Sequence, residues 1–135
     1  MVLDQDLIER LHVDKDYIKS QYLKELDEAL RREEVYSQSK KVSLKNRTVI
    51  LVDDGIATGA TIEAAIGAIR DKKPRRLVLA VPVAPASSVK KLEKLVDRAV
   101  VLHSPQDFYA IGQFYSSFPQ VTDQEVIKIL RGKGR

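Results

Sequence analysis

The chain has 135 residues, the length of one domain, and its 44% hydrophobic and 31% charged residues are typical of a globular protein. The net charge of +4 is small and spread over several segments, which argues against nucleic acid as a partner. The sequence contains no cysteine, no apolar run long enough to span a membrane and no signal peptide at its start. We therefore expect a cytoplasmic protein without disulfides, thiolate metal sites or a membrane partner.

Residues 1–36 are predicted to be helical, with a short first turn at 4–11 and a longer helix that runs to about Val35. Asp14 can cap the longer helix, because its carboxylate can accept hydrogen bonds from the first backbone N–H groups. Apolar residues recur along this helix every four positions and form one stripe: Ile18, Tyr22, Leu26 and Leu30. Ser, Gln and Lys then dominate residues 37–47, which predicts a flexible loop.

Three apolar runs are typical of strands in a buried parallel sheet: Thr48–Val52, Leu77–Val83 and Ala99–Leu102. Helical spacing fills the first gap over 61–70, and a second helix begins after Ser87 or Ser88, either of which can cap it. The order strand, helix, strand, helix, strand over 48–104 predicts an α/β fold with an incomplete, doubly wound parallel sheet.

The remaining segment, 105–135, begins with an irregular aromatic stretch that contains Phe108 and Tyr109. Thr122 is followed three residues later by Glu125, and this capping-box pattern predicts a last helix. We expect all of these parts to form a single domain over 1–135.

The strongest functional signal lies between Asp53 and Thr61. Two adjacent carboxylates follow the first strand, at the end of a parallel sheet where ligands bind in open α/β folds. Small residues and hydroxyls come next and lead into a helix: Gly55, Ala57, Thr58, Gly59, Ala60 and Thr61. Small residues let backbone N–H groups approach an anion, and the positive end of the helix dipole faces the same loop. The pattern predicts a phosphate cradle, although it matches neither Gly-Lys-Ser/Thr nor Gly-x-Gly-x-x-Gly.

Asp53 and Asp54 would repel a phosphate, so they need a different target. The vicinal hydroxyls of a ribose suit them, because each carboxylate can accept one O–H donor. A phosphate site beside a diol site describes a ribose 5-phosphate unit.

The segment Asp53–Thr61, with the apolar strand before it, resembles the phosphoribosyl-diphosphate (PRPP) signature of type I phosphoribosyltransferases. Less specific similarity extends over 1–131, through Arg32–Tyr36, Pro82–Pro85 and Phe108–Tyr115, to a poorly characterised bacterial and archaeal branch of that family.

The resemblance implies an enzyme that transfers the phosphoribosyl group of PRPP to a nitrogenous acceptor. Asp53 and Asp54 would be the catalytic pair that holds the ribose hydroxyls. The Mg²⁺ cofactor carried by PRPP would lie near them and act through substrate or water, without a direct protein ligand. The loop would bind the 5-phosphate through its small residues and hydroxyls: Gly55, Ala57, Thr58, Gly59, Ala60 and Thr61. Tyr36, Phe108 and Tyr109 are candidates for contacts with the acceptor or the mobile loop.

The sequence departs from the family pattern in two ways, and each bears on the expected function. Ala57 stands where enzymes for 6-oxopurines carry an acid, which argues against a hypoxanthine or guanine acceptor. The upstream half that grips the diphosphate in the family has no counterpart here, so the alternative is a non-catalytic PRPP- or nucleotide-binding regulator, or a remnant. An uncovered strand edge would then favour a homo-oligomer or a partner chain that covers the sheet.

Overall fold

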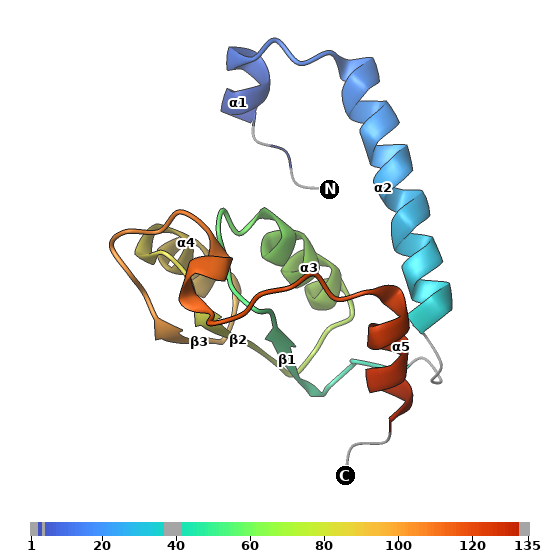
Figure 1. Ribbon diagram of the computed structural model, residues 1–135, viewed down its shortest axis with the longest axis vertical. Helices are drawn as coiled ribbons and strands as arrows, with labels where there is room; N and C mark the ends of the chain where they lie inside the picture. Colours follow the sequence, from blue (N-terminus) through green and yellow to red (C-terminus); the bar gives the residue numbers. More distant parts are fainter. Residues whose placement is uncertain (1–2, 4, 37–41, 133–135) are drawn as a thin grey trace. The chain divides into compact units, whose positions relative to one another are not determined.

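The computed structural model places the chain in two compact units, and it describes residues 3, 5–36 and 42–132 (Figure 1). A helical unit combines described residues of 3–42 and 119–135, and an α/β unit contains residues 43–118. The single domain over 1–135 stays a prediction. Part of the expected flexible loop, residues 37–41, lies outside the described residues. Among the described helices, none is both long enough and apolar enough to cross a lipid bilayer.

The helical unit contains α1 (Gln5–Arg10), α2 (Lys15–Tyr36) and α5 (Asp123–Arg131). The predicted caps are confirmed. Asp14 Oδ1 accepts a hydrogen bond of 2.7 Å from the N–H of Asp16 at the start of α2. Thr122 Oγ1 accepts from the N–H of Glu125, whose carboxylate accepts in return from the N–H of Thr122 at 2.8 Å. The apolar stripe of α2 stays largely in solvent, and Leu26 and Leu30 are 40% and 56% exposed.

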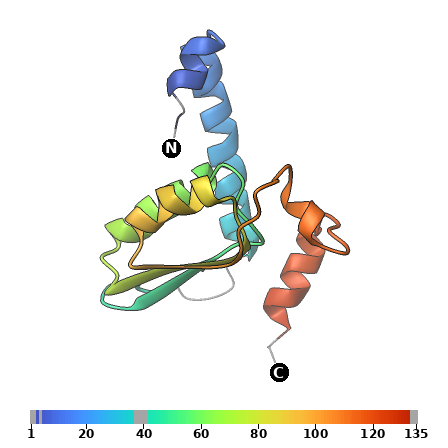
Figure 2. The same ribbon diagram turned by 90° about the vertical axis from the view of Figure 1, so that its left-hand side faces the viewer.

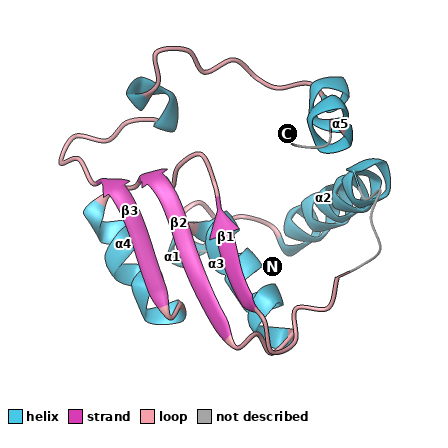
Figure 3. Ribbon diagram, turned by 90° about the horizontal axis from the view of Figure 1, so that it is seen from below, coloured by secondary structure: helices cyan, strands magenta, loops and turns pink. Residues whose placement is uncertain are grey.

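The α/β unit contains a parallel sheet of β1 (Thr48–Val52), β2 (Arg76–Val83) and β3 (Arg98–His103), in the order β1-β2-β3 (Figure 3). Helix α3 (Ala60–Asp71) connects β1 to β2, and α4 (Ala86–Leu92) connects β2 to β3. Two short 3₁₀ turns complete the unit, η1 (Glu93–Leu95) and η2 (Ile111–Phe114). The predicted α/β core is therefore confirmed, and each strand lies within a residue or two of its expected bounds.

Both crossover helices lie on the same face of the sheet (Figure 2). Two right-handed crossovers that step in one direction, from β1 to β2 to β3, place their helices on one side. That face is apolar and buried, with Leu77 and Leu79 at most 1% exposed. The opposite face holds alternate residues of the same strands and remains open, with Ile50, Val52 and Leu102 exposed by 62%, 67% and 80%. The sheet is incomplete, as predicted: among the described residues, no strand pairs with the free edge of β1.

The expected cap of the second crossover helix is wrong. Helix α4 begins at Ala86, and Pro85 occupies the capping position with extended backbone angles. Ser88 lies inside the helix, is only 6% exposed, and donates its hydroxyl hydrogen bond to the carbonyl oxygen of Ala57 at 2.6 Å. The side chain that looked like a cap is thus used to contact the loop after β1.

Candidate ribose-phosphate site

The loop that follows β1 surrounds a small cavity at the carboxyl end of the strand. The cavity has a volume of about 190 Å³ and is lined by residues 53–62 together with Ile111. Asp53 and Asp54 are both exposed, and Asp53 Oδ1 accepts a 3.0 Å hydrogen bond from the N–H of Asp54. The two carboxylates therefore face solvent at the mouth of the loop, where a sugar can reach them.

Buried residues fasten the loop to the rest of the unit. Ile56 is 2% exposed, and its N–H donates to the carbonyl of Val83 at 2.9 Å. Gly55 lies so close to Ile111 that a Cβ atom there would be 2.7 Å from the Ile111 Cγ2 atom. Gly59 has a φ of +83°, a left-handed backbone conformation that favours glycine. The backbone of the loop is thus set by packing on its inner side.

The outer side of the loop presents polar groups without partners. Within the described chain, the backbone N–H groups of residues 57–61 have no hydrogen-bond acceptor. Ala57, Thr58, Ala60 and Thr61 are exposed, and helix α3 begins at Ala60. Free N–H groups at a helix start, with hydroxyls beside them, attract an anion. The predicted cradle residues are therefore brought together around one cavity.

The other predicted contact residues have separate positions. Phe108 stacks on Phe114, with ring centroids 5.5 Å apart and planes 30° apart, so it belongs to an aromatic cluster that also includes His103. Tyr109 is 88% exposed. Tyr36 belongs to the helical unit, and its hydroxyl donates a hydrogen bond to Asp123 Oδ1. Contacts of these three side chains with an acceptor stay a prediction.

Three residues that support the loop were missed by sequence reasoning. Ser88 holds the carbonyl of Ala57, Ile111 packs against Gly55, and the Tyr115 hydroxyl donates to the carbonyl of Asp54 at 2.6 Å. Ser88 and Tyr115 lie 31 and 61 residues away from their partners along the chain. No spacing rule connects such distant positions, although Tyr115 falls in the aromatic stretch.

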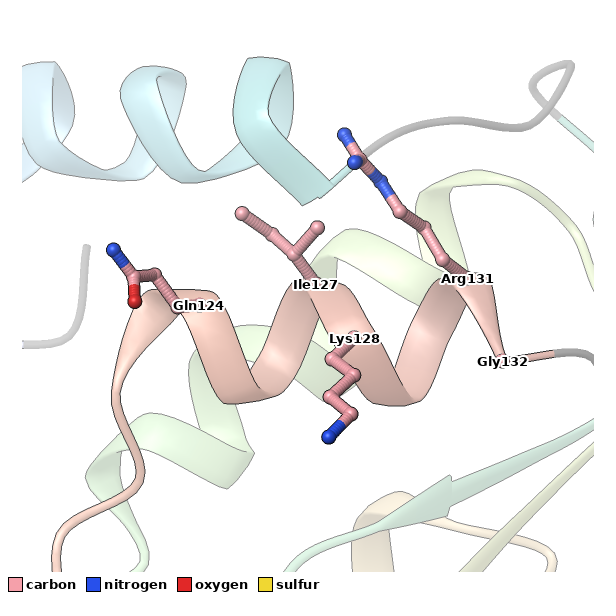
Figure 4. Close-up of a pocket in the computed structure, with 5 residues that line it drawn as sticks. All are labelled: Gln124, Ile127, Lys128, Arg131 and Gly132. Carbon is pink, nitrogen blue, oxygen red and sulfur yellow. The ribbon is translucent and has the colours of Figure 1, made fainter.

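A larger hollow of about 590 Å³ lies against α5 and has different chemistry. It is lined by Gln124, Ile127, Lys128, Arg131 and Gly132. Ile127 and Arg131 project from one side of the helix and Lys128 from the other (Figure 4). The charges of Lys128 and Arg131 therefore do not converge, and no carboxylate lines this hollow. We assign the candidate site to the smaller cavity for this reason.

Comparisons with known proteins show to which family the chain is similar. Residues 2–117 match the family profile described as "Phosphoribosyl transferase domain". The protein named "Putative phosphoribosyl transferase Rv0571c" from Mycobacterium tuberculosis is 37% identical over 130 residues, which are 96% of this chain and 29% of that protein. The "Bifunctional protein pyrR" of Enterococcus faecalis is 47% identical over 51 residues, which are 37% of this chain and 29% of that protein.

A solved structure shares the fold. The crystal structure of TT1426 from Thermus thermophilus is 41% identical in sequence and superposes with a TM-score of 0.75. The likeness covers 87% of this chain and 57% of that one. The chain therefore spans 57% of this relative and 29% of the mycobacterial one. With the family profile matched over 2–117, the chain belongs to the phosphoribosyl transferase family.

Proposed function

We propose that this chain binds PRPP at the 53–61 loop and transfers its phosphoribosyl group to a nitrogenous acceptor. One observation carries the proposal: five unpaired backbone N–H groups and two exposed carboxylates surround the same 190 Å³ cavity. The N–H groups suit a phosphate, and the carboxylates suit hydroxyl donors but not a second phosphate. A ribose 5-phosphate satisfies both halves with a single ligand.

In the proposed reaction, a nitrogen of the acceptor forms a bond to the anomeric carbon of the ribose. The bond from that carbon to the diphosphate breaks, diphosphate leaves with the electron pair, and the N–H proton of the acceptor passes to solvent. Positive charge develops on the sugar as the bond breaks. Asp53 and Asp54 stabilise that charge electrostatically while they hold the 2′- and 3′-hydroxyls.

Mg²⁺ enters this proposal with the diphosphate, as part of the substrate. Mg²⁺ keeps several of its waters and is often bound by one or two carboxylates together with substrate phosphates. Asp53 and Asp54 supply two exposed carboxylates, and among the described residues no group of three or more His, Cys, Asp or Glu side chains could hold a metal by itself. Two exposed carboxylates beside a phosphate site suit an ion that the diphosphate also binds, and we propose that they act on it through water or the sugar.

Tyr109 is the better of the two aromatic candidates for stacking on an acceptor base. It is 88% exposed, whereas Phe108 already stacks on Phe114. Ala57 offers only a methyl group where 6-oxopurine enzymes present an acid, so we propose a different acceptor class. A Tyr109→Ala variant should raise the KM for the acceptor and leave PRPP binding unchanged.

We also infer that a second copy of the chain covers the free edge of the sheet. β1 is one of the two edge strands, and its residues Ile50 and Val52, on the open face of the sheet, are exposed by 62% and 67%. Such an edge offers unpaired backbone groups and apolar side chains to another chain. Light scattering over a dilution series should show a dimer or larger species, and a stable monomer at high concentration would contradict this inference.

Calorimetric titration tests the proposed function directly. We expect PRPP to bind more tightly with Mg²⁺ than without it, and more tightly than inorganic phosphate. The double variant Asp53→Asn, Asp54→Asn should weaken PRPP binding more than about tenfold, because charge-assisted hydrogen bonds to the sugar are lost, and should spare inorganic phosphate. Asp71→Asn, which changes an exposed carboxylate at the other end of α3, is the matched control.

Equal loss of PRPP and phosphate binding in the double variant would contradict the assigned roles. Diphosphate release with purine, pyrimidine or nicotinamide acceptors would support the enzyme. PRPP binding without turnover on any of them would support the alternative of a non-catalytic, PRPP-sensing regulator.

A further inference from the structure

Ser88 is unusual among the buried residues of the α/β unit. Within the described chain it is the only polar or charged side chain in the buried set, and the other buried side chains are apolar. Its hydroxyl donates a 2.6 Å hydrogen bond to the carbonyl oxygen of Ala57, in the middle of the loop. A buried hydroxyl needs such a partner, but the choice of this particular carbonyl has a consequence for the loop.

The consequence follows from the geometry of the peptide bond. The carbonyl of Ala57 and the N–H of Thr58 belong to one planar trans peptide unit and point in opposite directions. Because Ser88 holds the carbonyl against α4, the N–H of Thr58 must point away from α4. That N–H is one of the unpaired donors of the loop. Ser88 therefore fixes the direction of a donor that it does not itself contact.

The same helix supports the loop at a second point. Leu92 lies one helical turn after Ser88, is fully buried, and its Cδ1 atom would be 3.1 Å from a Cβ atom at Gly59. Gly59 is held in its left-handed conformation directly against this side chain. Helix α4 thus sets one peptide orientation through Ser88 and restricts Gly59 through Leu92.

We propose that Ser88 is a positioning residue for the phosphoryl group, because it aims the N–H of Thr58 at the anion. This inference rests on the proposed function, since it assumes that the loop binds a phosphate. Without the hydroxyl, the peptide between Ala57 and Thr58 can rotate, and binding of a phosphate then carries the entropic cost of ordering it again. The affinity for phosphate falls, although Ser88 lies behind the loop and does not face the ligand.

The experiment titrates the full chain with inorganic phosphate and follows the backbone amide signals of residues 57–61 by NMR. Ser88→Ala should weaken phosphate binding about three- to tenfold, the loss expected for one hydrogen bond, and should reduce the shift change of Thr58 most. Ser87→Ala is the matched control, because Ser87 is its neighbour in α4 and is exposed. It should bind phosphate like the wild type.

A second variant keeps the test decisive if Ser88→Ala does not fold. Ser88→Cys is close in size and keeps a weaker donor, so its affinity should fall between those of the wild type and the alanine variant. A purely structural role would lower the melting temperature without phosphate and leave the dissociation constant at low temperature unchanged.

The outcomes separate the two proposals. If the wild type binds phosphate and Ser88→Ala or Ser88→Cys binds it equally well, the positioning role is overturned while the proposed function stands. A wild type that does not bind phosphate or PRPP overturns the proposed function and this inference with it.

Discussion

The loop after β1 and the ion cluster of the helical unit differ in whether their polar groups are paired within the protein. We define the ion cluster as Glu28, Arg31, Arg32 and Asp123. Its charges satisfy one another: Glu28 accepts from Arg31 at 2.6 Å and from Arg32 at 2.7 Å, and Arg31 pairs with Asp123 at 2.9 Å. In the loop, the N–H groups of residues 57–61 have no acceptor within the described chain and Asp53 and Asp54 are exposed, whereas Ile56 and Gly59 are buried.

The difference is between polar groups that are available to a ligand and polar groups that already pair with one another. Polar groups that are left unpaired on a tightly packed backbone are ready for a ligand, because little order remains to be gained when the ligand arrives. Charges that pair with each other on an exposed surface add modest stability and have no capacity left for a ligand. Substitutions in the two regions should therefore differ in the size of their effects and in what they do to ligand binding.

The largest difference should appear when a leucine is truncated in each region. Leu92→Ala removes a fully buried side chain from beneath the loop and should cost about 2–5 kcal/mol of unfolding free energy. Leu23→Ala removes a side chain of α2 that is 54% exposed and should cost less than about 0.5 kcal/mol. Urea denaturation measures the unfolding free energy of both variants. Similar losses of unfolding free energy in the two variants would contradict the expected difference between the two regions.

Glycine substitutions within α3 and its cap should give effects of opposite sign. Gly59→Ala places a Cβ atom at a φ of +83° and against Leu92, so it should destabilise the α/β unit by about 1–3 kcal/mol and weaken phosphate binding. Gly67→Ala meets no atom within 4 Å and should stabilise the helix by up to about 1 kcal/mol. Thermal unfolding with and without phosphate checks the pair, and the reverse order of melting temperatures would refute it.

The cap of α5 should have an intermediate effect that leaves the ligand site untouched. Thr122→Ala removes the hydroxyl that accepts from the N–H of Glu125, and it should cost about 1 kcal/mol of stability. Thr122→Ser keeps the hydroxyl and serves as the control. Calorimetric titration should give the wild-type affinity for phosphate in both variants, and a shared loss of affinity would mean that the two regions are coupled.

The ion cluster should give the smallest change, visible as a dependence on pH. Hydrogen bonds from Arg31 and Arg32 lower the pKa of Glu28 to about 2, and those from Tyr36 and Arg31 also lower the pKa of Asp123. Because these pKa values are depressed in the folded state, the stabilisation is present above the ordinary pKa of Glu28, 4.5, and is lost as the pH falls toward 2. Helix content measured by circular dichroism should fall over this window, and Glu28→Gln should flatten the curve.

Elements with a local cause were predictable from the sequence, and contacts between distant segments were not. The run Thr48–Val52 is apolar throughout, so its place in a parallel sheet could be anticipated, and Thr122 with Glu125 is a self-contained cap. Ser88 is a residue type that often caps a helix, and it stands near the start of α4. In the structure, however, Pro85 occupies the capping position, and the Ser88 hydroxyl donates to the carbonyl of Ala57 instead. Such a choice depends on tertiary packing, which no local pattern contains.

The same limit applies to the faces of the sheet. Hydrophobic runs predicted strands that are covered on both sides, since Ile50 and Val52 are as apolar as Leu51. Whether a helix covers a face depends on the direction in which successive crossovers step, and here both step the same way. The sequence pattern therefore predicted the strands correctly, but it could not predict which face of the sheet the helices cover.

The position of β1 at the border of the sheet has a consequence for ligand recognition. Any strand that joined it in parallel would end beside Asp53, and the turn after that strand would open onto the same mouth. Residues of that turn would then be placed to contact the half of the proposed ligand that extends past the sugar. Under the proposed function, recognition at this locus would then be shared, with the 5-phosphate end bound by the loop after β1 and the leaving-group end contacted by the added strand.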